Sequence, residues 1–276
     1  MTGLDELFEA LQAGPVVLVR VESVQGSGPR EVGAWMAVTA TGLIATIGGG
    51  HLEFEATAHA RGLLQGQLLP LKRRFPLGPS LGQCCGGVVD LTFEPLPRER
   101  SAVHMDDLRE RLRPPEASLL PVALFGGGHV GRAIVELLAR LPSRVQWFDS
   151  REEVFPPRLP DHIQAEHSEP VQAAVQDLAP GSHVLIMSFS HAEDLDVLAA
   201  CLARQRLRGD LAFIGLIGSK SKWASFQTRL RQRGFSAAEL SGVICPIGLA
   251  GVLGKQPDVV ALAAVAQLFS IWNPVT

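Results

Sequence analysis

The stretch ALFGGGHVGRA, residues 123–133, decides the fold of the second half of the chain. It starts like a buried strand and ends with the apolar spacing of a helix. Between them lie glycines in GxGxxG order, Gly126, Gly128 and Gly131. The next predicted strand, RVQWFD, ends in Asp149, eighteen residues after Gly131. This arrangement predicts a strand–helix–strand unit of the dinucleotide-binding type.

Two interpretations of this unit remain open. In one, the glycine loop and the helix N-terminus hold a pyrophosphate, and Asp149 accepts hydrogen bonds from ribose hydroxyls. In the other, the glycines only allow the strand and the helix to pack closely. Arg151 follows Asp149 by two residues and can pair either with a phosphate or with a neighbouring carboxylate.

The rest of the chain predicts two domains. Strands alternate with helical patterns from residue 121 to 214, which predicts a doubly wound parallel sheet. The first third is rich in strands, with helices expected over 4–11 and 53–64. Residues 95–115 are rich in proline and charge, which is typical of a linker with a helical turn. We therefore expect an α/β protein with a mixed α+β domain over 1–97, a linker over 98–118 and a Rossmann-like domain over 119–276.

Composition excludes several classes of protein. The 276 residues carry a formal net charge of −3 and no basic run interleaved with aromatics, so we expect no nucleic-acid partner. The four cysteines form no CxxC pair, which argues against a zinc module and a secreted disulfide scaffold. No signal peptide or membrane-spanning run is visible, so the prediction is a cytoplasmic protein that does not enter a membrane.

The run LGQCCGG, residues 81–87, carries adjacent thiols between glycines. A thiolate can act as a nucleophile or as a ligand for a soft metal, and small neighbours leave both sulfurs accessible. A disulfide between neighbours would be strained. The alternative is that Cys84 and Cys85 are only small buried fillers.

Two further glycine loops lie in the first half. GSGPREVGAWM, residues 26–36, predicts a tight turn, and TIGGGHLE, residues 46–53, predicts a loop entering a helix. Backbone amides of consecutive glycines can bind an oxyanion, and an arginine can bind phosphate through two hydrogen bonds. The candidate contacts are Ser27, Pro29, Arg30, Gly48, Gly49 and Gly50. Ordinary hairpin turns are the alternative.

Weaker candidates follow later strands. SFSHAEDLD places His191, Asp194 and Asp196 where a parallel sheet binds ligands, although these are also ordinary residues for a helix start. GLIGSKSK offers Gly218, Ser219 and Lys220 to an anion, or only a serine cap with solvated lysines. We assign no catalytic residue.

Taken together, the motifs resemble the XdhC-type xanthine dehydrogenase accessory proteins of the XdhC/CoxI family. The resemblance covers nearly the whole chain and rests on GSGPREVGAWM, TIGGGHLE, LGQCCGG, ALFGGGHVGRA with WFDSR, SHAEDL, FIGLIGSKSK and CPIGLAGVLGKQP. It implies an XdhC/CoxI-type domain followed by a Rossmann-like domain. It also implies a chaperone, not an enzyme, that binds the molybdenum cofactor, supports its sulfuration with a cysteine desulfurase and delivers it to the molybdenum-binding subunit of xanthine dehydrogenase.

Carried onto this sequence, the family's cysteine loop corresponds to Gln83, Cys84 and Cys85, with the thiols as candidate molybdenum ligands. The first glycine turn corresponds to Ser27, Pro29 and Arg30. The family commonly has a histidine two places before the one matched by His191, and here that place is Phe189. A two-histidine metal site is therefore not expected. Self-association into a homo-oligomer is expected of a protein with several partners.

Two other functions fit parts of the sequence. An NAD(P)-dependent oxidoreductase would use GGGHVG for the dinucleotide, with His191 or Cys245 near the transferred hydride, but leaves LGQCCGG without a role. A regulatory protein would sense a nucleotide with its second half and bind a partner with its first half. In that case both thiols would be dispensable.

Overall fold

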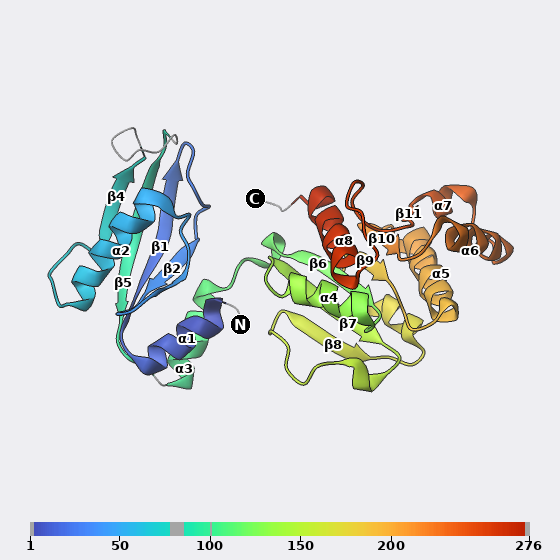
Figure 1. The fold of residues 1–276 in the computed structure, drawn as a ribbon, viewed down its shortest axis with the longest axis horizontal. Coiled ribbons are helices and arrows are strands. Elements are labelled where there is room, and N and C mark those ends of the chain that lie inside the picture. The colour runs from blue at the N-terminus through green and yellow to red at the C-terminus, as the bar shows by residue number, and fades with distance from the viewer. Residues whose placement is uncertain (1–2, 78–85, 100, 274–276) are drawn as a thin grey trace. The chain divides into compact units, whose positions relative to one another are not determined.

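The computed structural model describes residues 3–77, 86–99 and 101–273 (Figure 1). These residues form two compact units, 1–113 and 114–276. Each unit has its own sheet and its own buried core. Within the described ranges, no helix is long and apolar enough to cross a bilayer.

The described part of the first unit contains a five-stranded antiparallel sheet in the order β3-β2-β1-β5-β4. The strands are β1 (Val16–Gln25), β2 (Trp35–Val38), β3 (Leu43–Ala45), β4 (Lys72–Pro76) and β5 (Val88–Leu96). The sequence of β2 and β3, with Thr41-Gly42 between them, is typical of a hairpin, whereas that of β4 gives no sign of a strand. Its sequence KRRFP buries only Phe75, so it lacks the apolar alternation by which a strand is recognised.

The valine-rich sequence of β1 supplies both faces of this sheet. Side chains alternate along a strand, so Val17 and Val19 pack against α2 (Gly50–Leu64), while Val16 and Leu18 pack on the opposite side. There they meet α1 (Gly3–Ala13) and α3 (Ala102–Leu112) (Figure 1). The sheet is therefore covered by helices on both faces, with α1 and α3 near one end.

The segment predicted as a linker is more structured than expected. The division between the units follows Arg113, inside the predicted linker 98–118. Most of this segment is α3, whose Met105, Leu108 and Leu112 are buried against α1. Their spacing of three and four residues places them on one helix face. Because the residues between them are mostly charged, the sequence was interpreted as a linker and not as a helix of the core.

The second unit is built on a parallel sheet. Its described residues form six parallel strands in the order β11-β10-β9-β6-β7-β8. The strands are β6 (Leu120–Phe125), β7 (Ser143–Asp149), β8 (Ile163–His167), β9 (His183–Ile186), β10 (Phe213–Leu216) and β11 (Val243–Ile244). Counted from β6 this is the order 3-2-1-4-5-6 of dinucleotide-binding folds. The predicted doubly wound α/β fold is confirmed.

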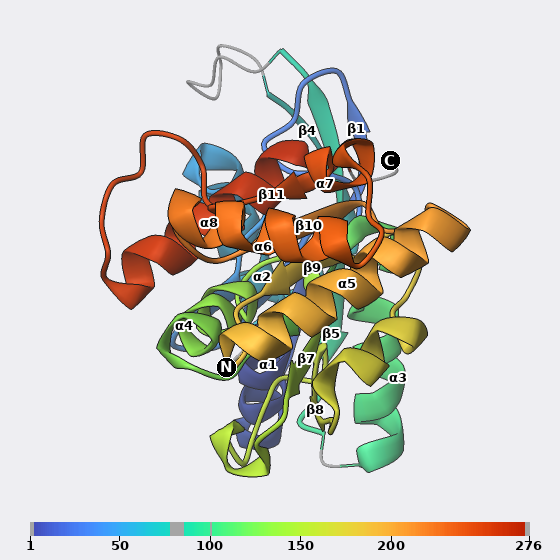
Figure 2. The same cartoon turned by 90° about the vertical axis from the view of Figure 1, so that its right-hand side faces the viewer.

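Helices cover both faces of this sheet (Figure 2). Val122 and Leu124 of β6 face α4 (His129–Leu138) and α8 (Pro257–Ile271). Ala123 and Phe125 face the other side. That side is covered by α5 (His191–Arg208), α6 (Lys220–Gln232), α7 (Ala237–Ser241) and the 3-10 segment Val171–Asp177. Both faces of the strand are thus apolar, as expected for a buried parallel sheet.

The glycines of GGGHVG make this packing possible. A Cβ atom on Gly126, whose φ is +126°, would lie 1.9 Å from the Met187 carbonyl oxygen of the neighbouring strand end. A Cβ atom on Gly131 would lie 2.0 Å from the Gly126 carbonyl oxygen. Gly128, by contrast, begins α4 with open space around it. Close packing therefore explains two of the three glycines.

We predict that Gly131→Ala destabilises the protein by at least about 2 kcal/mol, because the new methyl group cannot fit against Gly126. On helix propensity alone, the same change would stabilise by about 1 kcal/mol. Urea denaturation measures the difference. The matched control is Gly128→Ala, which should cost no more than about 1 kcal/mol. Equal stability of the two variants would contradict the packing argument.

Candidate functional site

In the first unit, the site predicted from sequence lies at the end of the sheet where β4 leads to β5. The amide of Leu77 donates to the Gly87 carbonyl oxygen at 2.7 Å, which joins the two ends of the connecting loop. Residues 78–85 lie outside the described residues, and with them Gln83, Cys84 and Cys85. The structure thus defines the position of the two loop ends.

The first glycine turn packs directly against the residues that follow the cysteines. A Cβ atom on Gly87 would lie 2.2 Å from the Ser27 carbonyl oxygen, and one on Gly26 would lie 3.3 Å from the Gly87 Cα atom. The same turn also contacts the second glycine loop, because a Cβ atom on Gly48 would lie 2.5 Å from Pro29 Cβ. Three segments chosen from sequence are therefore brought together at one end of the unit.

The amides of the TIGGGHLE loop already have an anionic partner. Glu53, in the first turns of α2, accepts hydrogen bonds from the amides of Ile47 and Gly49, each at 3.1 Å, and from the Thr46 hydroxyl at 2.5 Å. The Gly48 amide donates to Thr46 Oγ1 at 3.0 Å. The predicted oxyanion nest thus holds a carboxylate of the same chain. From the sequence, Glu53 was only the first residue of the helix expected over 53–64.

Arg30 lies beside this loop with an exposed partner. Its guanidinium makes two hydrogen bonds to the neighbouring Glu31, at 2.8 and 3.0 Å, and a third to the Thr46 carbonyl oxygen at 3.3 Å. The hydrogen bonds to Glu31 raise the pKa of Arg30. Because both side chains are well exposed, this pair contributes little to stability, and an incoming anion can replace Glu31 at small cost.

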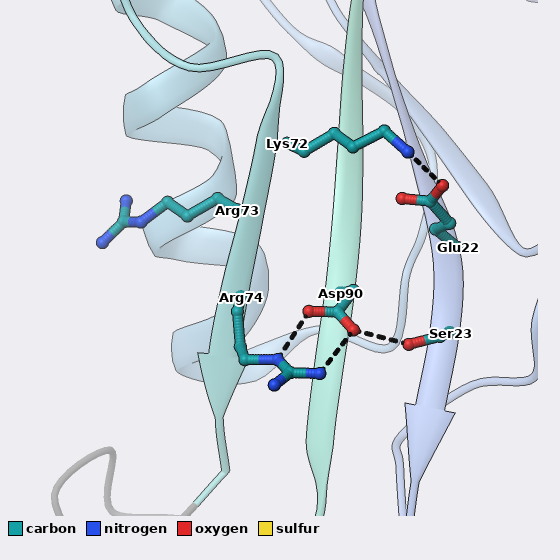
Figure 3. Close-up of a pocket in the computed structure, with 6 residues that line it drawn as sticks. All are labelled: Glu22, Ser23, Lys72, Arg73, Arg74 and Asp90. Carbon is teal, nitrogen blue, oxygen red and sulfur yellow. Dashed lines mark hydrogen bonds and ion pairs between the residues drawn. The ribbon is translucent and has the colours of Figure 1, made fainter.

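A polar network holds the base of the cysteine loop. Arg74, near the end of β4, makes two hydrogen bonds to Asp90 of β5, and Ser23 of β1 donates to the same carboxylate at 2.7 Å (Figure 3). These hydrogen bonds, first that from Arg74, lower the pKa of Asp90. The network therefore ties together the strand that enters the loop, the strand that leaves it and β1.

The network lines a depression of ≈ 500 Å³ on the surface of β1, β4 and β5, together with the ion pair between Lys72 and Glu22. Sequence analysis missed all of these residues, because they depend on the pairing of β4, a strand it did not predict. Among the described residues, no three His, Cys, Asp or Glu side chains lie close enough to hold a metal ion.

In the second unit, Asp149 lies at the predicted strand end but is enclosed by protein donors. The amide of Gly127 donates to Oδ2 at 2.5 Å, and Arg151 donates to Oδ1 through its amide and Nε, both at 2.9 Å, and to Oδ2 through Nη2 at 3.0 Å. Burial by itself would raise the pKa of Asp149, but these hydrogen bonds outweigh it and lower the pKa. Of the two roles considered for Arg151, the structure shows the carboxylate pairing.

A second buried ion pair links two motifs that were considered separately. Lys222 of GLIGSKSK donates to Asp194 of SHAEDL at 2.6 Å and to the Ile217 carbonyl oxygen at 3.0 Å. The Ser188 amide donates a further hydrogen bond to the Asp194 carboxylate, at 2.7 Å. Gly218 makes room for the lysine, since a Cβ atom there would lie 2.6 Å from Lys222 Cδ. Sequence analysis named Lys220 as the candidate lysine and missed Lys222.

The remaining candidates of the second unit have other partners. His191 stacks edge-on against Phe226, and Asp196 pairs with Arg233 on the surface. Burial raises the pKa of the Cys245 thiol, and it raises that of the fully buried Cys201 to about 12. Neither thiol is an activated nucleophile, so the described part of the second unit offers no reactive cysteine.

Comparison with known proteins places the chain in a family. Its second unit matches the XdhC Rossmann domain over residues 122–268, and its first matches the XdhC and CoxI family over residues 10–72. With this order of domains, the chain is a two-unit protein with a Rossmann fold. It belongs to the XdhC family.

Two known proteins are similar to the chain. The chain is 27% identical to the uncharacterized protein YqeB of Escherichia coli over 274 residues, and the match covers 94% of the chain but 44% of that longer protein. It also resembles the crystal structure of a Bacillus halodurans protein described as a xanthine dehydrogenase, with a TM-score of 0.66, 20% identity and coverage of 98% and 96% of the two chains. The latter similarity concerns the fold.

We predict that Lys222→Met destabilises the protein by about 3 kcal/mol, because it leaves the buried Asp194 carboxylate without its cation. Chemical denaturation followed by circular dichroism measures the loss. Lys220→Met is the matched control, since Lys220 lies in the same turn and is exposed, and it should change stability by less than about 0.5 kcal/mol. Similar values for both variants would show that the pair does not hold the two loops together.

Proposed function

We propose that the protein binds the molybdenum cofactor with its first unit, supports its sulfuration, and inserts it into the molybdenum-binding subunit of a xanthine dehydrogenase. The observation that carries the proposal is the packing of Gly26 and Ser27 against Gly87, immediately after the two cysteines. This packing holds a turn that carries an arginine against the residues that follow the two cysteines in the sequence. Membership of the XdhC family supports the same assignment.

The chemistry of these residues fits the parts of the cofactor. Its phosphate suits Arg30, whose exposed pairing with Glu31 is readily exchanged, and the amide and hydroxyl of Ser27. Pro29, which has no N–H to donate, restricts the backbone of the turn. Its molybdenum suits the soft thiolates of Cys84 and Cys85. The loop Gly48, Gly49 and Gly50 acts by supporting the turn, since Glu53 accepts hydrogen bonds from that loop. When bound, the cofactor supplies the metal centre that the client enzyme requires.

The partners follow from this role. A cysteine desulfurase would supply sulfur to the bound cofactor, and the client subunit would accept it. The protein itself would turn over no substrate. The second candidate function, an NAD(P)-dependent oxidoreductase, is supported by the GGGHVG motif and by the order of strands in the second unit.

The first test is the content of pterin and molybdenum in the purified protein, by fluorescence after oxidation and by elemental mass spectrometry. We expect both in wild-type protein loaded with the cofactor, and their loss in the Cys84→Ala, Cys85→Ala double variant, because the thiols hold the metal. Cys245→Ala is the control, since Cys245 lies in the other unit, and should retain both. Equal cofactor content in the double variant would contradict the proposal.

A second test concerns the base of the loop. We predict that Asp90→Ala weakens cofactor retention severalfold, because Arg74 and Ser23 lose their common partner and no longer fix the loop ends. Affinity is measured by pterin fluorescence during anaerobic titration. Asp106→Ala is the control, as Asp106 is an exposed residue of α3. The prediction fails if the two variants bind alike while both remain folded by circular dichroism.

A further inference from the structure

The parallel sheet of the second unit changes its winding direction between β6 and β9, because α4 after β6 and α5 after β9 pack on opposite faces of the sheet. Folds with this strand order bind nucleotides there, with the pyrophosphate at the loop after the first strand. The ribose diol then lies against an acidic residue at the end of the second strand. In this chain these positions belong to Gly126–Gly128 and to Asp149.

The position that a ribose would need is already filled. A carboxylate offers about four hydrogen-bonding sites, and the described residues supply four donors to Asp149, three of them from Arg151. The Asp149 side chain is 1% exposed. A ribose hydroxyl can reach it only after the guanidinium has moved away.

Arg151 is itself held from the outer side. Its guanidinium carbon lies 4.2 Å from the centre of the Phe189 ring, and Phe189 is 64% exposed. The Phe189 amide donates to Glu193 at 3.1 Å, and Ser150 donates to the same carboxylate at 2.9 Å. The Arg151 guanidinium therefore has Asp149 on one side and the Phe189 ring on the other. Glu193 links the loop after β7, through Ser150, to the loop after β9, through Phe189.

The charges around Arg151 also disfavour a ribose that carries a phosphate. Arg151 is the cation, but Asp149 pairs with it directly and the carboxylates of Glu153 and Glu193 lie close enough to raise its pKa. A phosphate would meet three carboxylates around one guanidinium. Without these carboxylates, an arginine next to this strand end would favour the 2′-phosphate of NADP.

The glycine loop is linked to the same group of residues through a hydrogen bond to Asp149. Gly127 gives its amide to Asp149, and Gly126 and Gly131 owe their lack of a side chain to contacts with Met187 and with each other. Gly127 is thus engaged with Asp149, whereas Gly128 lies in open space at the start of α4.

We infer that Arg151, stacked between Asp149 and Phe189, closes the ribose position of the Rossmann unit, so that this unit does not take up NAD or NADP unless the guanidinium is displaced. Arg151 is thus a specificity-determining residue that excludes adenine dinucleotides. This inference does not depend on cofactor binding by the first unit.

The test is calorimetric titration of the full chain with NAD⁺ and NADP⁺. Wild-type protein should show no saturable binding of either up to about 1 mM. Arg151→Ala uncovers Asp149 and should bind NAD⁺ at least about tenfold more tightly than wild type, with NAD⁺ preferred over NADP⁺. Arg158→Ala, an exposed arginine a few residues further on, is the matched control and should behave as wild type.

Two results would overturn the inference. One is binding of NAD⁺ or NADP⁺ by the wild-type protein in the micromolar range. The other is a folded Arg151→Ala variant with no gain in affinity, because Arg151 would then not be what closes the position. If Arg151→Ala does not fold, Phe189→Ala replaces it, since Phe189 is exposed and its loss frees the outer face of the guanidinium. It should give a smaller gain for NAD⁺, and no gain would count against the inference.

Discussion

The structure depends on backbone segments that approach each other so closely that no side chain fits between them. In the first unit, Gly87 lies against the Ser27 carbonyl oxygen, and in the second, Gly126 lies against that of Met187. At such points only glycine is tolerated, whatever conformation the backbone adopts. These contacts bring the two glycine loops and residues 86–87 together in the first unit, and the ends of β6 and β9 together in the second.

Each unit also turns a carboxylate of its own onto a glycine loop. Glu53 accepts hydrogen bonds from Ile47 and Gly49, and Asp149 accepts one from Gly127. The arginines beside the loops differ in exposure, however. Arg30 pairs with an exposed glutamate, whereas Arg151 pairs with a carboxylate that is 1% exposed. Displacing a charged partner costs little free energy on the surface and more in the interior. This difference underlies our proposals that Arg30 can accept an anion and that Arg151 closes the ribose position.

The fold was predictable from sequence where apolar periodicity and glycines coincided, as at GGGHVG. Elements with few buried residues escaped prediction, such as β4, with only Phe75 buried, and β8, with only Ile163. The site was predictable as a set of loops but not as a set of contacts. The pairing of Lys222 with Asp194 depends on β10 lying next to β9, and that of Arg74 with Asp90 depends on β4 lying next to β5. Local patterns contain no information on such neighbours.

The central claim is that the cysteine loop and the first glycine turn form one cofactor site. Alkylation of the thiols with iodoacetamide, mapped by mass spectrometry with and without bound molybdenum cofactor, tests it most directly. The account predicts that the cofactor protects Cys84 and Cys85 and leaves the labelling of Cys245 unchanged. Equal labelling of Cys84 and Cys85 in the free and loaded protein would contradict it.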